Sequence, residues 1–131
     1  MSLLPVVAFA TLTALPVQGA PMQAVPSGQP IELIEVLLDE VGAEQWVRFR
    51  FLTPQIGRST GTISFAQAEL DFEYLCRHIA LPYLTDYNLT PDIVAVTLLD
   101  RPVAFGVSDQ SATQFVDLFR VTSGACVWEG A

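Results

Sequence analysis

The sequence contains no lysine, and its basic residues form no cluster. Six arginines face 14 acidic residues, which brings the net charge to −8. The arginines lie at Arg48, Arg50, Arg58, Arg77, Arg101 and Arg120. Because neutralising phosphates requires a basic face, this distribution excludes a nucleic-acid-binding protein.

Cysteine and histidine, the usual ligands of zinc, are few. The chain has two cysteines without a Cys-x-x-Cys motif, and a single histidine, His78. A structural zinc site takes four Cys or His ligands, so that class of site is excluded. No Gly-x-Ser-x-Gly motif marks a nucleophilic serine. We therefore predict no metal site and assign no catalytic residue.

Apolar residues, in contrast, are abundant. Of the 131 residues, 51% are hydrophobic and only 15% are charged. This composition is sufficient for a buried core, and it excludes an intrinsically disordered chain, which combines low hydrophobicity with high net charge. The length limits the protein to one domain.

The N-terminal segment has the features of a secretory signal peptide. Residues 3–17 are apolar apart from two threonines, and small residues lie three and one positions before Ala20. We predict a signal peptide over 1–19, cleaved before Ala20. A transmembrane anchor is the alternative, but the apolar run is shorter than the ~20 residues of a bilayer span and contains two prolines. The mature chain is then expected to be periplasmic or secreted, with no stable membrane span.

The first structured element is expected to be a β-hairpin. Residues 31–38 and 45–52 are strand candidates, and apolar residues alternate with Arg48 and Arg50 in the second of them. This alternation places both arginines on the outer face of the hairpin. There they either bind an anion or pair with acidic neighbours such as Glu35.

A main helix follows the hairpin. It begins at Ser64, which forms a Ser-x-x-Gln capping box with Gln67. We predict that the helix spans about 64–80 and ends before Pro82, because the residue that precedes a proline is disfavoured in the helical conformation. The stretch 82–92 is then irregular.

The C-terminal part is expected to contain further strands and one short helix. Residues 93–99 form a run rich in β-branched side chains, which is typical of a central strand. Asp109 is a suitable cap for a short helix over about 109–117.

The two cysteines are predicted to form a disulfide. Ser123 and Gly124 join two short strands in which Val121 faces Cys126, so Cys126 points toward the core. Cys76 lies on the core face of the main helix. In an oxidising compartment an even number of cysteines in a small domain usually pairs. Two buried free thiols and a reactive cysteine are the alternatives.

Together these patterns predict one α+β domain over 31–131, preceded by a flexible leader over 20–30. The sheet is expected to be antiparallel, with about five or six strands and the 64–80 helix packed on one face. A short helix over about 109–117 completes this fold.

Two stretches carry a resemblance to known sequences: ELDFEYLC at 69–76, and IVAVTLLDRPVAFGVSDQSATQFVDLFRVTSGACVWEG at 93–130. They resemble a family of short exported proteins of unknown function from Gram-negative bacteria. The resemblance implies export and paired cysteines, and no activity or catalytic residue. Some members carry an acetolactate-synthase label, but the 112 residues of a mature chain that starts at Ala20 are too few to hold a thiamine cofactor between large domains. We therefore predict no cofactor.

The residues that most suggest binding are aromatic. Leu70 and Tyr74 lie on the helix face opposite the core, and Tyr83, Asp86 and Tyr87 follow in the stretch expected to be irregular. Tyrosine offers a large contact area with a polar tip and is enriched at interfaces. We predict a binding surface at these five residues, in a non-enzymatic binding or accessory module of the cell envelope. Its partner would be an envelope protein or a small ligand.

His78 supports an alternative function. A small hydrolase-like enzyme would use His78 as its acid or base, together with a carboxylate such as Asp71 or Asp86. An ordinary surface histidine is the simpler interpretation, because the helical pattern places His78 near the solvent edge.

Overall fold

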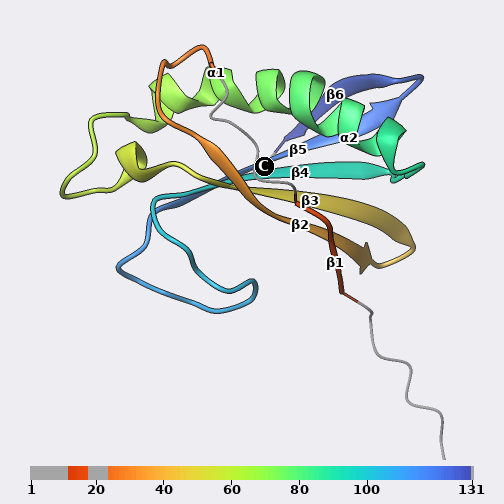
Figure 1. The fold of residues 1–131 in the computed structure, drawn as a ribbon, viewed down its shortest axis with the longest axis horizontal. Coiled ribbons are helices and arrows are strands. Elements are labelled where there is room, and N and C mark those ends of the chain that lie inside the picture. Colours follow the sequence, from red (N-terminus) through yellow and green to blue (C-terminus); the bar gives the residue numbers. More distant parts are fainter. Residues whose placement is uncertain (1–11, 18–23, 131) are drawn as a thin grey trace, which may run out of the picture.

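The computed structural model describes residues 12–17 and 24–130, which form a six-stranded sheet with helices on one face (Figure 1). The strands lie in chain order across the sheet: β1 (Thr13–Leu15), β2 (Glu32–Val41), β3 (Glu44–Leu52), β4 (Ile93–Leu99), β5 (Gln114–Thr122) and β6 (Ala125–Gly130). The helical elements are η1 (Pro54–Ile56), α1 (Phe65–Leu75), η2 (Cys76–Ala80) and α2 (Leu81–Asp86). The α+β fold with one main helix is thereby confirmed.

The sheet is mixed, so the prediction of an antiparallel sheet is wrong. β3 and β4 run parallel, from Trp46 opposite Ile93 to Leu52 opposite Leu99. The other neighbouring strands are antiparallel. The chain leaves the end of β3 and returns through the main helix to the start of β4, and parallel neighbours require such a crossover.

The first hairpin forms as its alternation predicts. β2 and β3 pair around a tight turn in which Gly42 has φ +61°, a conformation that favours glycine. Phe49 and Phe51 are buried in the core under the helix. Arg48 and Arg50 alternate with them and therefore lie on the outer face of the sheet.

The main helix begins with the predicted capping box. Ser64 Oγ accepts a hydrogen bond from the backbone amide of Gln67, and Gln67 Oε1 accepts one from the backbone amide of Ser64. The inner face of α1 buries Ala68, Phe72 and Leu75 against the sheet. Apolar spacing and cap together explain why the helix starts here and covers this face.

The main helix does not end before Pro82, which corrects the predicted boundary. The chain passes through the π-helical turn η2 into α2, which continues to Asp86. The backbone amide of Leu81 donates to the carbonyl oxygen of Cys76, five residues earlier. Pro82 therefore lies in the first turn of α2, where a proline is tolerated because it interrupts no established α-helical hydrogen bond.

The short helix predicted over 109–117 is absent from the described residues. The chain forms a loop over 100–113 and then enters β5, which pairs with β4 along seven residues. Asp109 Oδ1 accepts hydrogen bonds from the amide and hydroxyl of Ser111, which makes a local turn in place of a helix cap. The aromatic and β-branched residues of 114–122 are stabilised as a strand by this long-range pairing.

A disulfide joins Cys76 and Cys126, as predicted, with Cα atoms 6.3 Å apart. It links η2 to β6 at one edge of the sheet. Val121 pairs with Cys126 across the last hairpin, whose turn residues Ser123 and Gly124 both have positive φ. This turn geometry matches the twist of the two strands and turns the Cys126 side chain toward the helix.

The N-terminal part contributes to the fold on both sides of residues 18–23. Residues 12–17 belong to the predicted signal peptide, and within them β1 pairs antiparallel with β2. The predicted cleavage point before Ala20 lies outside the described residues. In the segment expected to be a flexible leader, Val25 and Gln29 are buried, and Ser27 and Gln29 donate hydrogen bonds to Asp71 of α1. In the described part of the chain, no helix has the length and apolar character needed to cross a bilayer.

Candidate functional site

A groove of about 580 Å³ lies beside α2, at the edge of the sheet that β1 and β2 form. Its walls come from η2, from α2 and the residue that follows it, from β2 and from the segment after β1. We call it the tyrosine groove; its lining residues are Val17, Leu33, His78, Ile79, Pro82, Tyr83, Asp86 and Tyr87. Three of the five residues predicted to bind, Tyr83, Asp86 and Tyr87, therefore line one hollow.

Tyr83 and Tyr87 form the aromatic wall of the groove. Tyr83 lies on α2 and Tyr87 caps its C-terminal end four residues later, and their rings stack with centroids 4.4 Å apart. Tyr83 also contacts the core residue Phe49 edge to face, at 5.4 Å. Its hydroxyl donates a hydrogen bond of 2.6 Å to the carbonyl oxygen of Pro16. Burial raises the pKa of Tyr83 above its usual value of 10, and neighbouring Tyr87 raises this pKa further.

Tyr74 and His78 form a second stacked pair, with centroids 4.2 Å apart. His78 is exposed and lines the groove, whereas Tyr74 is partly buried against the core. Among the described residues, His78 makes no hydrogen bond or ion pair with Asp71 or Asp86. The acid–base pair considered for a hydrolase is therefore not assembled.

Asp71 has a structural role on the inner side of α1. Its carboxylate is fully buried and accepts hydrogen bonds from the Ser27 amide, the Ser27 hydroxyl and Gln29 Nε2. Buried carboxylates need such donors, because an unpaired one would be strongly destabilising. Asp71 thus fixes the segment that leads into β2 against the helix.

Leu70 lies apart from the tyrosine groove. It is 66% exposed and lines a smaller hollow of about 300 Å³ with Trp128, which is 67% exposed. Trp128 Nε1 donates to Asp117 Oδ1 at 2.8 Å. The five residues predicted as one surface therefore do not form one: Tyr83, Asp86 and Tyr87 line the tyrosine groove, Leu70 lies at the second hollow, and Tyr74 packs against the core and lines neither. Trp128 was not predicted as a surface residue, because its exposure depends on the position of β6 at the sheet edge.

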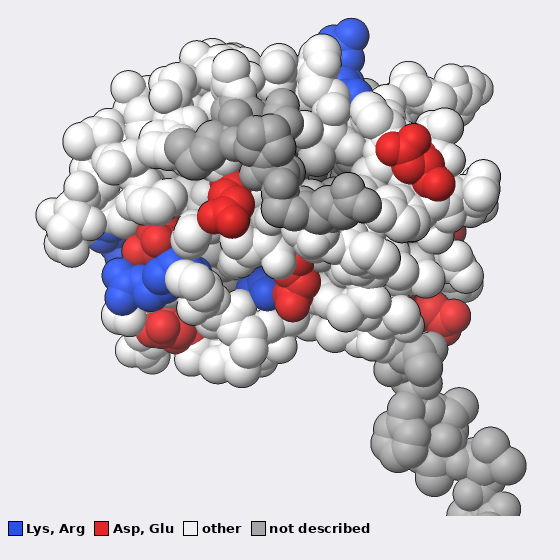
Figure 2. Space-filling model, viewed as in Figure 1, with Lys and Arg blue, Asp and Glu red and all other residues white. Residues whose placement is uncertain are grey.

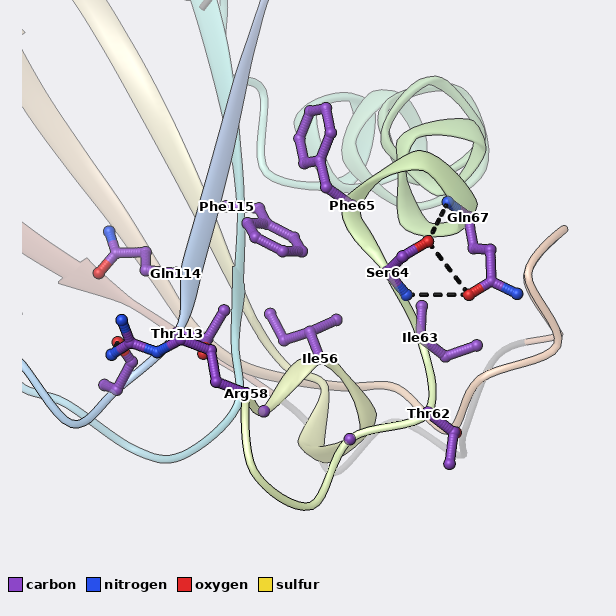
Figure 3. A pocket seen from close by; sticks show the side chains of 13 residues that line it. Ile56, Arg58, Thr62, Ile63, Ser64, Phe65, Gln67, Thr113, Gln114 and Phe115 are labelled. Atoms are coloured by element: carbon purple, nitrogen blue, oxygen red, sulfur yellow. Dashed lines mark hydrogen bonds between the residues drawn. The ribbon is translucent and has the colours of Figure 1, made fainter.

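A third hollow, of about 670 Å³, lies at the start of α1 (Figure 3). Phe65 and Phe115 meet edge to face there, with centroids 5.1 Å apart. Arg58 donates to the carbonyl oxygens of Gln110 and Ala112, which holds the loop before β5 in place. This hollow was not predicted, because its walls come from segments about 50 residues apart in the chain.

The outer face of the sheet carries the ion pairs expected for the first hairpin. Arg50 is 4% exposed, pairs with Glu35 at 2.6 Å and donates to the carbonyl oxygen of Val103 at 2.7 Å. Arg48 pairs with Asp39 at 3.0 Å. These arginines are therefore neutralised within the fold, and the face of the molecule drawn in Figure 2 shows no extended basic patch.

The chemistry of the groove follows from the side chains that line it. No group of three or more His, Cys, Asp and Glu side chains that could hold a metal ion occurs in the ranges 12–17 and 24–130. The tyrosine groove instead combines aromatic rings, one histidine and one carboxylate around an apolar floor. Such a surface is suited to apolar contacts with a few polar bonds.

Comparison with known proteins identifies a family. No curated protein and no solved structure matches the chain at a significant level. A family model described as "Family of unknown function (DUF6497)" matches residues 7–131, which includes all six strands and the main helix. The chain therefore belongs to this family of unknown function, DUF6497.

Proposed function

We propose that the protein is an exported, non-enzymatic binding module of the cell envelope, and that it binds its partner through the tyrosine groove. The observation that carries this proposal is the stacked pair of Tyr83 and Tyr87 beside an apolar floor. Aromatic side chains held rigid before binding lose little conformational entropy at an interface.

Export is supported by two independent features. The disulfide is compatible with an oxidising extracellular compartment, since such bonds rarely persist in the cytosol. The apolar segment 3–17, followed by small residues before Ala20, has the pattern of a cleaved signal peptide.

Binding is favoured over hydrolysis by the surroundings of His78. Its ring stacks on Tyr74, and Asp71 is engaged with Ser27 and Gln29 on the inner side of the helix. A histidine that acts as general base is normally oriented by a hydrogen-bonded partner.

Site-specific photo-crosslinking in the native cells tests this function. A photoreactive phenylalanine analogue at Tyr87 should form an adduct of discrete mass, because position 87 lines the groove. The same analogue at Ala66, an exposed position of α1 outside the groove, is the matched control and should form none. Absence of an adduct at position 87, or the same adduct at both positions, would contradict the proposed site.

The intact mass of the protein from its native envelope tests export separately. A chain that begins at Ala20 and gains the mass of two hydrogens on reduction is the expected result. A full-length chain with two free thiols would contradict export.

A further inference from the structure

We propose that the tyrosine groove and the adjoining edge of β2 bind an extended segment of a partner protein as an added antiparallel strand, in the place that residues 12–17 occupy in the uncleaved chain. The inference rests on the proposed function, since it requires both export and binding at the groove.

β1 shows how a strand lies on this edge. Leu15 pairs with Val36 and Thr13 with Leu38, antiparallel to β2. Leu15 and Val17 lie two residues apart, so they share a face, and both pack against the core. Val17 also lines the tyrosine groove. A strand in this position therefore places alternate apolar side chains under α2.

The polar contact across the groove is made to the main chain. Tyr83 donates its hydrogen bond to the carbonyl oxygen of Pro16, and every extended peptide offers such a carbonyl. Recognition by strand addition typically combines main-chain hydrogen bonds with pockets for alternate side chains. Both components are present at this edge.

The edge of β2 has the features of an edge that pairs with a short added strand. Val36, Leu37 and Leu38, the three residues that β1 pairs with, carry no charge. An exposed edge with apolar side chains is a template for another strand, and proteins usually protect such edges. Glu35 and Asp39 flank the uncharged stretch, which limits its length to that of a short added strand.

Cleavage before Ala20 would free this edge without releasing β2. Ser27 and Gln29 are held by the buried Asp71, downstream of the cleavage point. Ile31, at the entrance to β2, is buried in the core as well. The start of β2 is therefore anchored independently of residues 12–17.

Charge argues for a different protein as the occupant rather than a second copy. β2 carries four acidic residues and no basic one: Glu32, Glu35, Asp39 and Glu40. Glu35 and Asp39 are paired with Arg50 and Arg48, but Glu32 and Glu40 form no ion pair among the described residues. Two β2 edges paired antiparallel would bring these unpaired carboxylates near one another, and like charges across a ladder are destabilising. The expected occupant is an extended segment with apolar side chains at alternate positions.

Strand exchange in a nicked full-length chain tests the inference. A protease site placed within residues 18–23 lets the purified protein be cut while both parts are retained. The probe is a fluorescent peptide with the sequence of residues 12–17, LTALPV, followed by anisotropy. Saturable binding to the cut protein, and none to the uncut protein, is the expected result.

Two variant peptides distinguish strand addition from non-specific adhesion. Replacement of Leu15 and Val17 by serine should weaken binding at least tenfold, because both side chains face the core. Replacement of the exposed Ala14 by serine is the matched control and should leave binding unchanged. Equal binding of all three peptides, or none by any, would overturn the inference.

The outcomes separate this inference from the proposed function. If the Tyr87 adduct forms in cells but no peptide exchanges, the groove binds its partner in another way and the strand-addition proposal fails alone. If the cut protein dimerises on release of its N-terminal fragment, a second copy is the occupant and the proposal of a different partner is wrong.

Discussion

The two edges of the sheet are closed in different ways. At the β6 edge, a disulfide ties Cys126 to Cys76 of the main helix. At the β1 edge, three residues of the described part of the chain pair with β2, and a side-chain hydrogen bond from Tyr83 to the carbonyl oxygen of Pro16 adds to them. A covalent bond closes one edge, and a short strand, which we propose is exchangeable, covers the other.

The same helical segment serves both edges. Cys76, at the start of η2, faces β6, whereas Ile79 and Tyr83 line the groove near β1. The disulfide fixes the helical segment to β6, so the helical residues that line the tyrosine groove are held in place. The difference teaches that one edge of a small sheet can be fixed by a covalent bond while the other is covered by a few paired residues, as replaceable closure at β1 would require.

Removal of the disulfide should have the largest effect on stability. The bond closes a chain separation of 50 residues, for which the chain-entropy model gives about 4 kcal/mol as an upper value. We expect Cys76→Ser with Cys126→Ser to lower the free energy of unfolding by about 2–4 kcal/mol. Urea denaturation of the variant and the wild type measures this change. A loss below about 1 kcal/mol would contradict the role assigned to the β6 edge.

Loss of the buried carboxylate should have the next largest effect. Asp71→Leu leaves the donors of Ser27 and Gln29 without their acceptor, and we expect a loss of about 2 kcal/mol. Glu69→Ala, at an exposed position on the same helix, is the control and should change stability by less than about 0.5 kcal/mol. Equal effects of the two substitutions, measured by thermal denaturation, would contradict an anchoring role for Asp71.

Disruption of β1 in the uncleaved chain should cost less. Leu15→Asp places a charge against the core, and because β1 can detach we expect a loss of only about 1 kcal/mol, the free energy that holds this short strand in place. Leu12→Asp, at a 44% exposed position beside it, is the matched control and should have no effect. A loss as large as that caused by removing the disulfide would show that β1 is an integral strand.

The smallest effect is expected at the hydroxyl of Tyr83. Tyr83→Phe removes one hydrogen bond, for an expected loss of about 0.5–1 kcal/mol at neutral pH. Because burial raises the pKa of Tyr83 in the folded state, the unfolded chain ionises first, and stability falls as the pH rises above 10. Unfolding measured on both sides of pH 10 should show a smaller fall in Tyr83→Phe. An identical fall would contradict the partly buried position of Tyr83.

Much of the fold follows from local pattern. Alternation predicts the first hairpin, the Ser64–Gln67 capping box predicts the start of the helix, and two separate periodicities predict the Cys76–Cys126 disulfide. Each of these signals lies within a few residues of the element that it defines. Local chemistry therefore suffices for them.

The errors arise where distant segments decide the structure. The parallel pairing of β3 with β4 depends on the crossover, and β5 is a strand because β4 lies beside it, although Asp109 resembles a helix cap. Pro82 is accommodated by the π-helical turn η2, which the rule for residues that precede a proline does not predict. Long-range pairing prevailed over local propensity at β4 and β5, whereas a local π-helical turn accommodates Pro82.

The candidate site was predictable only in part. The clustering of tyrosines identified Tyr83 and Tyr87, which line one groove. The helical wheel joined Leu70 to them, but Leu70 lies beside Trp128 at another hollow. Val17 was not predicted to line the groove, because its segment has the pattern of a signal peptide.

Amide hydrogen exchange in the full-length protein tests the contrast between the two edges most directly. The hydrogen-bonded amides of β1 should exchange by local opening, with rates independent of low denaturant concentrations and at least tenfold faster than those of β6. The protected amides of β6 should exchange only with global unfolding. Equal protection at both edges, with the same denaturant dependence, would contradict the account of one locked and one replaceable edge.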